Sequence, residues 1–127
     1  MNDKRTIMIV DDHETIQLVV SNMLSDEFKI ITRSNGLEAL AYFRNGKFPD
    51  LVILDMVMPK LDGLDFLSNI RNSGMYKHIP VVILSGKADT PEFEQCKKIG
   101  IDGFIKKPFN PAELKNTIKK ALKQIHK

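Results

Sequence analysis

The stretch Val52–Gly63 reads VILDMVMPKLDG and joins an apolar run to a charged residue and a loop. The three residues before Asp55 are apolar and favour a buried strand. Pro59 and Gly63 favour a loop behind it. A carboxylate at the end of a buried strand is costly unless a cation or hydrogen-bond donors compensate for its lost hydration. The function therefore depends on what lies beside Asp55.

Short apolar runs recur along the chain, with enough residues between them for a helix. The first, third and fourth runs are continuously apolar, as strands covered on both faces usually are. The second and fifth runs are more polar, which indicates positions nearer a sheet edge. The predicted strands are Thr6–Val10, Phe28–Thr32, Leu51–Asp55, Val81–Ser85 and Gly103–Lys106.

The segments between these strands have helical periodicity. Asn35 with Glu38 is typical of a capping box, and Thr90 before Pro91 is typical of a helix start. Alternating strands and helices predict an α/β fold in which a mostly parallel sheet lies between two helical layers. The predicted apolar stripes are Ile16, Val19, Val20, Met23 and Leu24; Leu37, Leu40 and Phe43; Leu64, Leu67 and Ile70; and Leu114, Ile118, Ala121, Leu122 and Ile125.

Composition limits the classes of protein that the chain can belong to. With 127 residues, 43% hydrophobic and 28% charged, it is typical of one globular domain. No apolar run approaches the roughly 20 residues of a membrane span, and the N-terminus is no signal peptide. A single cysteine, Cys96, excludes an internal disulfide and favours the cytoplasm. A net charge of +3 is too small to indicate nucleic-acid binding, so we expect neither nucleic acid nor membrane as a partner.

Polar residues follow the carboxyl ends of the predicted strands. Asp11 and Asp12 come after the first strand, and Asp55 ends the third. Ser85 ends the fourth strand, and Lys107 follows the fifth. Because these strand ends meet at one rim of a parallel sheet, we expect the five side chains to converge. Three adjacent carboxylates repel one another, and a divalent cation such as Mg²⁺ together with a lysine would keep Asp55 ionised and able to act as a nucleophile.

Several of these residues also have simpler interpretations. Asp12 precedes a predicted helix and could be its N-cap. Ser85 stands before Gly86, a common turn pair, and a lysine is usually a solvated cation. We interpret His13 as a solvent-facing residue of the first helical turn, with a metal ligand as the alternative. Only the shared position of all these residues at one rim favours the functional interpretation.

Four motifs resemble those of the receiver domains of two-component response regulators. They are IMIVDDHE (Ile7–Glu14), VILDMVMPKLDG (Val52–Gly63), VVILSG (Val81–Gly86) and GFIKKPF (Gly103–Phe109). They follow one another on the predicted strands, and the resemblance extends over essentially the whole sequence. It implies a chemotaxis-regulator-like, flavodoxin-like three-layer fold with strand order 2-1-3-4-5. It also implies one receiver domain over residues 1–127, with no output domain in this chain.

The resemblance further implies a phosphorylation site. Asp55 would accept a phosphoryl group from the phosphohistidine of a sensor histidine kinase or a phosphotransfer protein. Mg²⁺ (or Mn²⁺) would be bound by the side chains of Asp12 and Asp55 and by the backbone carbonyl of Val57. Asp11 would act on the cation through a water molecule. Lys107 would pair with the phosphoryl group.

The same resemblance implies how the signal leaves the site. Ser85 would donate a hydrogen bond to the phosphoryl group, and Phe104 would turn inward as it does so. The peptide bond between Lys107 and Pro108 is expected to be cis. The fourth helix, fifth strand and fifth helix would form the surface for a downstream protein target. The chain would be a monomer or a phosphorylation-linked dimer, and not an enzyme that turns over an external substrate.

Three other hypotheses stay open from the sequence alone. The chain could be a receiver cut from a longer response regulator or hybrid kinase. A haloacid-dehalogenase-like phosphatase would use Asp55, but it needs an acid where Val57 stands. A flavodoxin needs a phosphate-binding loop where this chain has DDHET, and aromatic rings to stack on a flavin, where it has no Trp and two Tyr.

Overall fold

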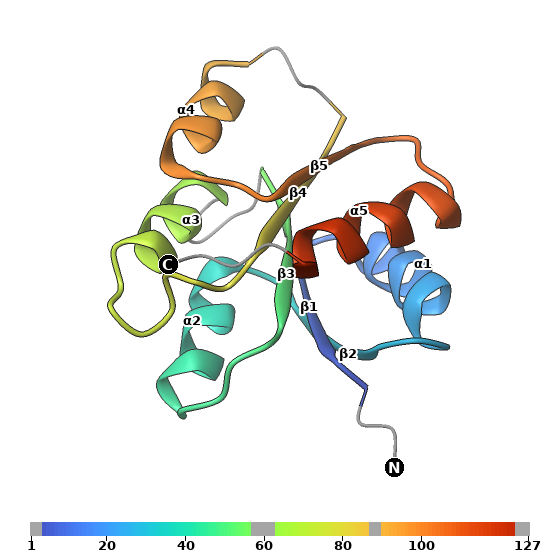
Figure 1. The fold of residues 1–127 in the computed structure, drawn as a ribbon, viewed down its shortest axis with the longest axis horizontal. Helices are drawn as coiled ribbons and strands as arrows, with labels where there is room; N and C mark the ends of the chain where they lie inside the picture. Colours follow the sequence, from blue (N-terminus) through green and yellow to red (C-terminus); the bar gives the residue numbers. More distant parts are fainter. Residues whose placement is uncertain (1–3, 57–62, 87–89, 124–127) are drawn as a thin grey trace.

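The computed structural model describes residues 4–56, 63–86 and 90–123, so Val57, Pro59 and Ile125 lie outside it. The described elements are β1 (Thr6–Val10), α1 (Glu14–Leu24), β2 (Lys29–Arg33), α2 (Gly36–Arg44), β3 (Leu51–Asp55), α3 (Gly63–Arg71), β4 (Val81–Ser85), α4 (Pro91–Ile99), β5 (Gly103–Lys106) and α5 (Pro111–Lys123). The strands form one parallel sheet in the order β2-β1-β3-β4-β5 (Figure 1). The predicted fold class and strand order are confirmed. Among the described residues, no helix has the length and apolar character needed to cross a membrane.

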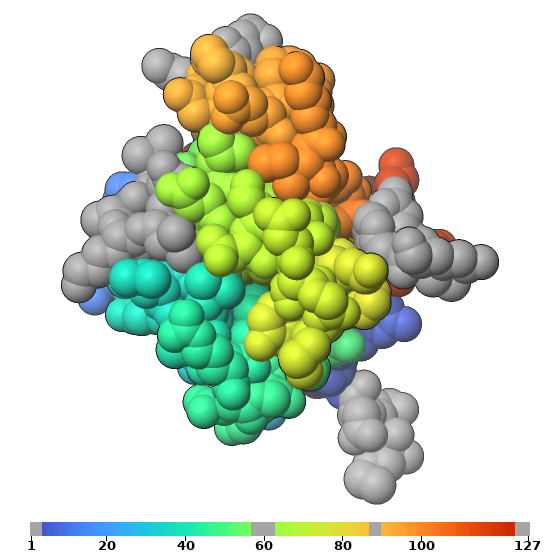
Figure 2. Space-filling view, turned by 90° about the vertical axis from the view of Figure 1, so that its left-hand side faces the viewer, coloured from blue at the N-terminus to red at the C-terminus, as the bar shows by residue number. Residues whose placement is uncertain are grey.

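Helices cover both faces of the sheet, with α1 and α5 on one face and α2, α3 and α4 on the other (Figure 1). Figure 2 shows the second of these layers, where α2, α3 and α4 lie side by side. Successive strand residues enter opposite cores: Ile53 packs in the core under α1 and α5, and Leu54 packs in the core under the other three helices. Because both faces are covered, the strands need apolar residues at nearly every position.

The second strand begins one residue later than predicted, at Lys29 instead of Phe28. The backbone N–H of Phe28 donates to the carbonyl of Leu24 at 2.9 Å, so this residue still belongs to the turn that ends α1. Its side chain is buried in the core. The strand continues to Arg33, which pairs with Val10 of β1. The start of β2 is therefore set by a local turn, which includes Phe28 although this residue is apolar enough for a buried strand.

The predicted helix caps at Asn35 and Thr90 are confirmed. The side-chain oxygen of Asn35 accepts from the N–H of Glu38 at 2.9 Å, and the Glu38 carboxylate accepts from the N–H of Ser34 at 3.1 Å. Thr90 Oγ1 accepts from the N–H of Phe93 at 3.1 Å. The contacts made by Asn35 and Thr90 each satisfy a backbone donor that the first turn of a helix leaves without an intrahelical partner, whereas the Glu38 carboxylate satisfies the N–H of the residue before the cap.

Two residues of the predicted apolar stripes are exposed instead of buried. Val19 is 39% exposed and Leu37 is 50% exposed. The stripe of each helix that packs into the core is narrower than the predicted one. It includes the buried residues Val20 and Leu24 of α1 and Phe43 of α2. Since successive helical residues turn by about 100°, a residue beside a buried one can still face solvent.

An ion pair between Arg71 and Asp102 braces the end of the sheet opposite the strands' carboxyl ends. Nη2 of Arg71 lies 3.1 Å from Oδ2 of Asp102, whose side chain is fully buried. The same carboxylate oxygen accepts from the N–H of Val81 at 2.8 Å. Arg71 also donates to the carbonyls of Ile79 and Gly100. Burial lowers the pKa of Arg71, and the carboxylate of Asp102 opposes that shift. The pair ties α3 to the segments that enter β4 and β5.

Candidate functional site

Asp11, Asp12, His13 and Asp55 form what we call the rim cluster, at the carboxyl end of the sheet. One ligand atom from each residue lies within 4.8 Å of those from the others. The carboxylates converge because β1 and β3 are adjacent and parallel, with Val10 opposite Leu54, so that the residues that follow come side by side. The structure thus brings together the three carboxylates that the strand ends predict.

Asp11 is the most deeply buried member of the rim cluster, with 1% of its surface exposed. Its Oδ1 accepts from the backbone N–H of His13 at 2.9 Å. Its Oδ2 is buried and has no hydrogen-bond partner among the described residues. Leaving such a polar atom without a partner costs about 1–3 kcal/mol. Buried oxygen donors with unused capacity are suited to a hard divalent cation, so the rim cluster fits the predicted Mg²⁺ site.

His13, and not Asp12, is the N-cap of α1, so the interpretation of Asp12 as a cap is wrong. The Asp12 carboxylate lies beside the imidazole instead, with its Oδ1 3.2 Å from Nδ1 of His13. The same nitrogen lies 3.0 Å from Oδ1 of Asp11. As predicted, the His13 side chain faces solvent, with 62% of its surface exposed, yet its Nδ1 contacts both carboxylates. The hydrogen bond to Asp11 is the largest cause that raises the pKa of His13, followed by the charges of Asp12 and Asp11.

Asp55 is 7% exposed and ends β3, where a close backbone contact limits its position. The N–H of Gly63 donates to the carbonyl of Met56 at 3.1 Å. A Cβ atom on Gly63 would lie 2.5 Å from the carbonyl oxygen of Asp55 and 2.8 Å from Cα of Met56. Only glycine allows the start of α3 to approach β3 so closely. The sequence by itself indicates only loop formation at Gly63, although the position of this glycine at the end of the Asp55 motif is a signal of its closer role.

The backbones of Ser85 and Lys107 lie at the same rim. Ser85 ends β4, next to Leu84, which pairs with Asp55. The N–H of Lys107 donates to the carbonyl of Ser85 at 2.9 Å, so the chain after β5 continues alongside β4. The peptide bond between Lys107 and Pro108 is cis. The roles of the Ser85 and Lys107 side chains stay predictions.

Phe104 of β5 is half-buried and packs against α4. Its ring centroid lies 4.6 Å from that of Phe93, at an interplanar angle of 52°. Phe93 is itself buried. Tilted aromatic contacts of this kind add about 0.5–1.5 kcal/mol beyond the area that they bury. The pair therefore couples the position of β5 to that of α4.

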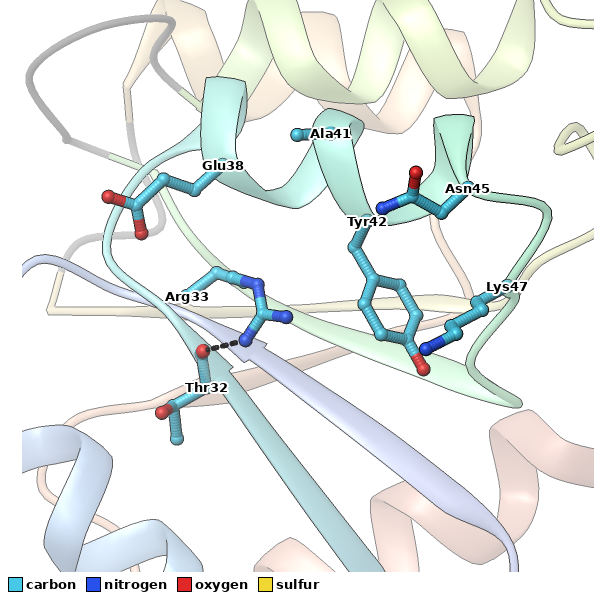
Figure 3. A pocket seen from close by; sticks show the side chains of 7 residues that line it. All are labelled: Thr32, Arg33, Glu38, Ala41, Tyr42, Asn45 and Lys47. Carbon is cyan, nitrogen blue, oxygen red and sulfur yellow. Dashed lines mark hydrogen bonds between the residues drawn. The ribbon is translucent and has the colours of Figure 1, made fainter.

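A separate cavity of about 450 Å³ lies between β2 and α2 (Figure 3). Arg33 extends into it, donates to the carbonyl of Thr32 at 2.7 Å and lies 5.2 Å from the ring centroid of Tyr42. None of the residues that line the cavity belongs to the rim cluster. The cavity is therefore not part of the candidate site.

Comparisons with known proteins agree on one family. Residues 7–119 match the family described as response regulator receiver domain. Chemotaxis protein CheY-3 of Vibrio cholerae is 35% identical over 127 residues, which cover 98% of this chain and 97% of that protein. The structure of V. cholerae chemotaxis protein CheY4 has a TM-score of 0.83 at 33% identity, covering 94% of this chain and 99% of that one. The phosphorylated cyanobacterial phytochrome response regulator RcpA has a TM-score of 0.80 at 28% identity, covering 92% and 90%. The chain belongs to the response regulator receiver domain family of two-component signalling proteins.

Proposed function

We propose that Asp55 accepts a phosphoryl group from the phosphohistidine of a sensor histidine kinase or a phosphotransfer protein. The observation that carries this proposal is the rim cluster, in which the buried Asp55 lies beside Asp11 and Asp12 at the carboxyl end of the sheet. Membership of the receiver domain family also supports this proposal, because receiver domains act in two-component signalling and are not turnover enzymes. One structural relative, RcpA, is described as phosphorylated.

The proposed transfer exchanges one bond to phosphorus for another. A carboxylate oxygen of Asp55 attacks in line with the N–P bond of the phosphohistidine. The O–P bond forms as the N–P bond breaks, and the departing imidazole keeps the electron pair. It leaves as a neutral ring because its other nitrogen carries a proton. The hydroxyl of Ser85 and the ammonium of Lys107 contact the phosphoryl oxygens, where charge is spread in the transition state.

The rim cluster supplies the acidic residues for the cation that this chemistry needs. Mg²⁺ (or Mn²⁺) would be held by the side chains of Asp12 and Asp55 and the backbone carbonyl of Val57, with Asp11 acting through a water molecule. When bound, such a cation neutralises part of the charge on the phosphoryl oxygens. The buried Oδ2 of Asp11, which has no partner among the described residues, supports this assignment.

Phosphorylation would be read at the surface formed by α4, β5 and α5, which binds a downstream protein target. The contact between Phe104 and Phe93 supports this part of the proposal, because it links β5 to α4. As Ser85 donates to the phosphoryl group, Phe104 turns inward and leaves that contact. Since the kinase domain of a phosphohistidine donor uses ATP inside the cell, we place this exchange in the cytoplasm.

Acetyl phosphate provides a direct test of the proposal. The purified chain is incubated with acetyl phosphate and Mg²⁺, and its intact mass is measured. We expect a gain of one phosphoryl group in the wild type and in Asp65→Asn, which changes an exposed aspartate of α3. We expect no gain in Asp55→Asn or when the cation is chelated. Equal labelling of Asp55→Asn and the wild type would show that the acceptor is another residue.

A further inference from the structure

We infer that His13 is a ligand of the rim-cluster cation site and makes this site favour borderline transition-metal cations, such as Co²⁺, Ni²⁺ and Zn²⁺, over Mg²⁺. The inference rests on the cation site of the proposed function and adds a nitrogen ligand to it. His13 takes no part in the proposed phosphoryl transfer, and it is not one of the Mg²⁺ ligands proposed above.

The first support is the position of the imidazole. Nδ1 of His13 lies 3.0 Å from Oδ1 of Asp11 and 3.2 Å from Oδ1 of Asp12. Adjacent ligands of an octahedral metal with bonds of about 2.1 Å lie about 3.0 Å apart, and opposite ligands about 4.2 Å apart. The four ligand atoms of the rim cluster all lie within 4.8 Å of one another. Small side-chain movements would bring the ligand atoms of His13, Asp12 and Asp55 around one cation, with Asp11 acting through a water molecule.

The second support is the buried Oδ2 of Asp11, which has no partner among the described residues. Only 1% of the surface of Asp11 is exposed, so bulk water does not donate a hydrogen bond to this oxygen. A carboxylate oxygen held in this way, next to a histidine nitrogen and two further carboxylates, points to a hydrated divalent cation, one of whose bound water molecules would donate to this oxygen.

The backbone around His13 holds the ring at the cluster without burying it. Its N–H donates to Oδ1 of Asp11 at 2.9 Å, and its carbonyl accepts from the N–H of Gln17 at 3.1 Å. The side chain is 62% exposed, so the ring can adjust toward a cation without repacking the core. His13 therefore lies at a fixed place in the chain, with its ring at the exposed side of the cluster.

The types of ligand atom at the site decide which cations bind more tightly because of His13. Mg²⁺ takes oxygen ligands and retains several waters, so a nitrogen ligand adds little to its binding. Imidazole is a good ligand for Zn²⁺ and Ni²⁺. At sites with nitrogen and oxygen ligands, affinity for first-row divalent metals generally rises from Mn²⁺ through Co²⁺ to Ni²⁺. We therefore expect these cations to compete with Mg²⁺ at this site more effectively than they would at a site made of carboxylates alone.

The test compares the wild type with His13→Ser and with His78→Ser. Serine is favourable at an N-cap, so the first variant keeps the start of α1 but has no ring nitrogen. His78 is exposed and lies outside the rim cluster, which makes its variant the matched control. Dissociation constants for Zn²⁺, Ni²⁺ and Mg²⁺ are measured by calorimetry. Bound Co²⁺ is followed by its visible absorption and by the paramagnetically shifted imidazole resonances.

We expect His13→Ser to weaken Zn²⁺ and Ni²⁺ binding by at least about tenfold, with a much smaller change for Mg²⁺. The shifted imidazole resonances of the Co²⁺ form should disappear in this variant and persist in His78→Ser. An unchanged ratio of Zn²⁺ to Mg²⁺ affinity in His13→Ser would overturn the inference and leave the proposed function intact. If the wild type bound none of these cations, the cation site of the proposed function would fall as well.

Discussion

Replacing Gly63 by alanine tests whether α3 approaches β3 as closely as the structure indicates. The added Cβ would lie 2.5 Å from the carbonyl oxygen of Asp55, 2.8 Å from Cα of Met56 and 3.0 Å from its carbonyl oxygen. All three are backbone atoms, so no change of side-chain rotamer can relieve the contact. Ordinary contacts begin at 3.4 Å, so the backbones must separate by up to 0.9 Å, the difference between 3.4 and 2.5 Å.

This displacement should lower both stability and activity. Overpacking of a well-packed site costs about 1–3 kcal/mol. Gly63 is the first residue of α3, so the helix propensity of alanine offsets little of that loss. For a domain of this size, a loss of about 1–3 kcal/mol corresponds to a decrease in Tm of roughly 3–15 °C. Because a misplacement of about 1 Å can slow a reaction by about a hundredfold, phosphorylation of Asp55 should also be markedly slower.

Gly74→Ala is the matched control for this prediction. A Cβ on Gly74 would meet no atom within 4 Å, and its φ is not in the left-handed region. This variant should be as stable as the wild type or more stable by up to about 1 kcal/mol. Urea unfolding, thermal melting and the rate of labelling by acetyl phosphate are measured for both variants. Equal stability and equal labelling rates in the two variants would refute the close approach of Gly63 to β3.

Three further predictions concern the rest of the fold. Asp102→Ala leaves the largely buried Arg71 charged and without its carboxylate partner, so urea unfolding should show a loss of about 3–5 kcal/mol. Adding Arg71→Met should cost less than the sum of the two single changes, and strict additivity would argue against the ion pair. Thr90→Ala removes the cap on the N–H of Phe93 and should lower the unfolding free energy by about 1 kcal/mol, whereas an unchanged midpoint would count against the cap. Cys96 has no exposed surface, so a thiol reagent should modify it only as the chain unfolds, and rapid modification of the native chain would contradict its burial.

Much of the fold follows from local patterns in the sequence. Val81–Ser85 and Leu51–Asp55 have the predicted bounds, since a run of apolar residues ended by a polar one leaves little freedom for a strand covered on both faces. The caps at Asn35 and Thr90 were equally readable, because they depend on contacts within a few residues. The strand order was available only through the resemblance to receiver domains, because periodicity does not tell which strands are neighbours.

The rim cluster shows the same division between local and distant contacts. The sequence alone placed Asp11, Asp12 and Asp55 at strand ends, and the rule that parallel strands end at one rim predicted their convergence. Only the tertiary structure decided that Oδ2 of Asp11 is buried without a partner among the described residues, and that the imidazole of His13 lies against two carboxylates. It also decided why VILDMVMPKLDG ends in glycine: the space left by the missing Cβ at Gly63 is filled by the backbone of the residues that end β3. Such contacts join residues that are distant in the chain, or depend on how a side chain turns, and no local pattern encodes them.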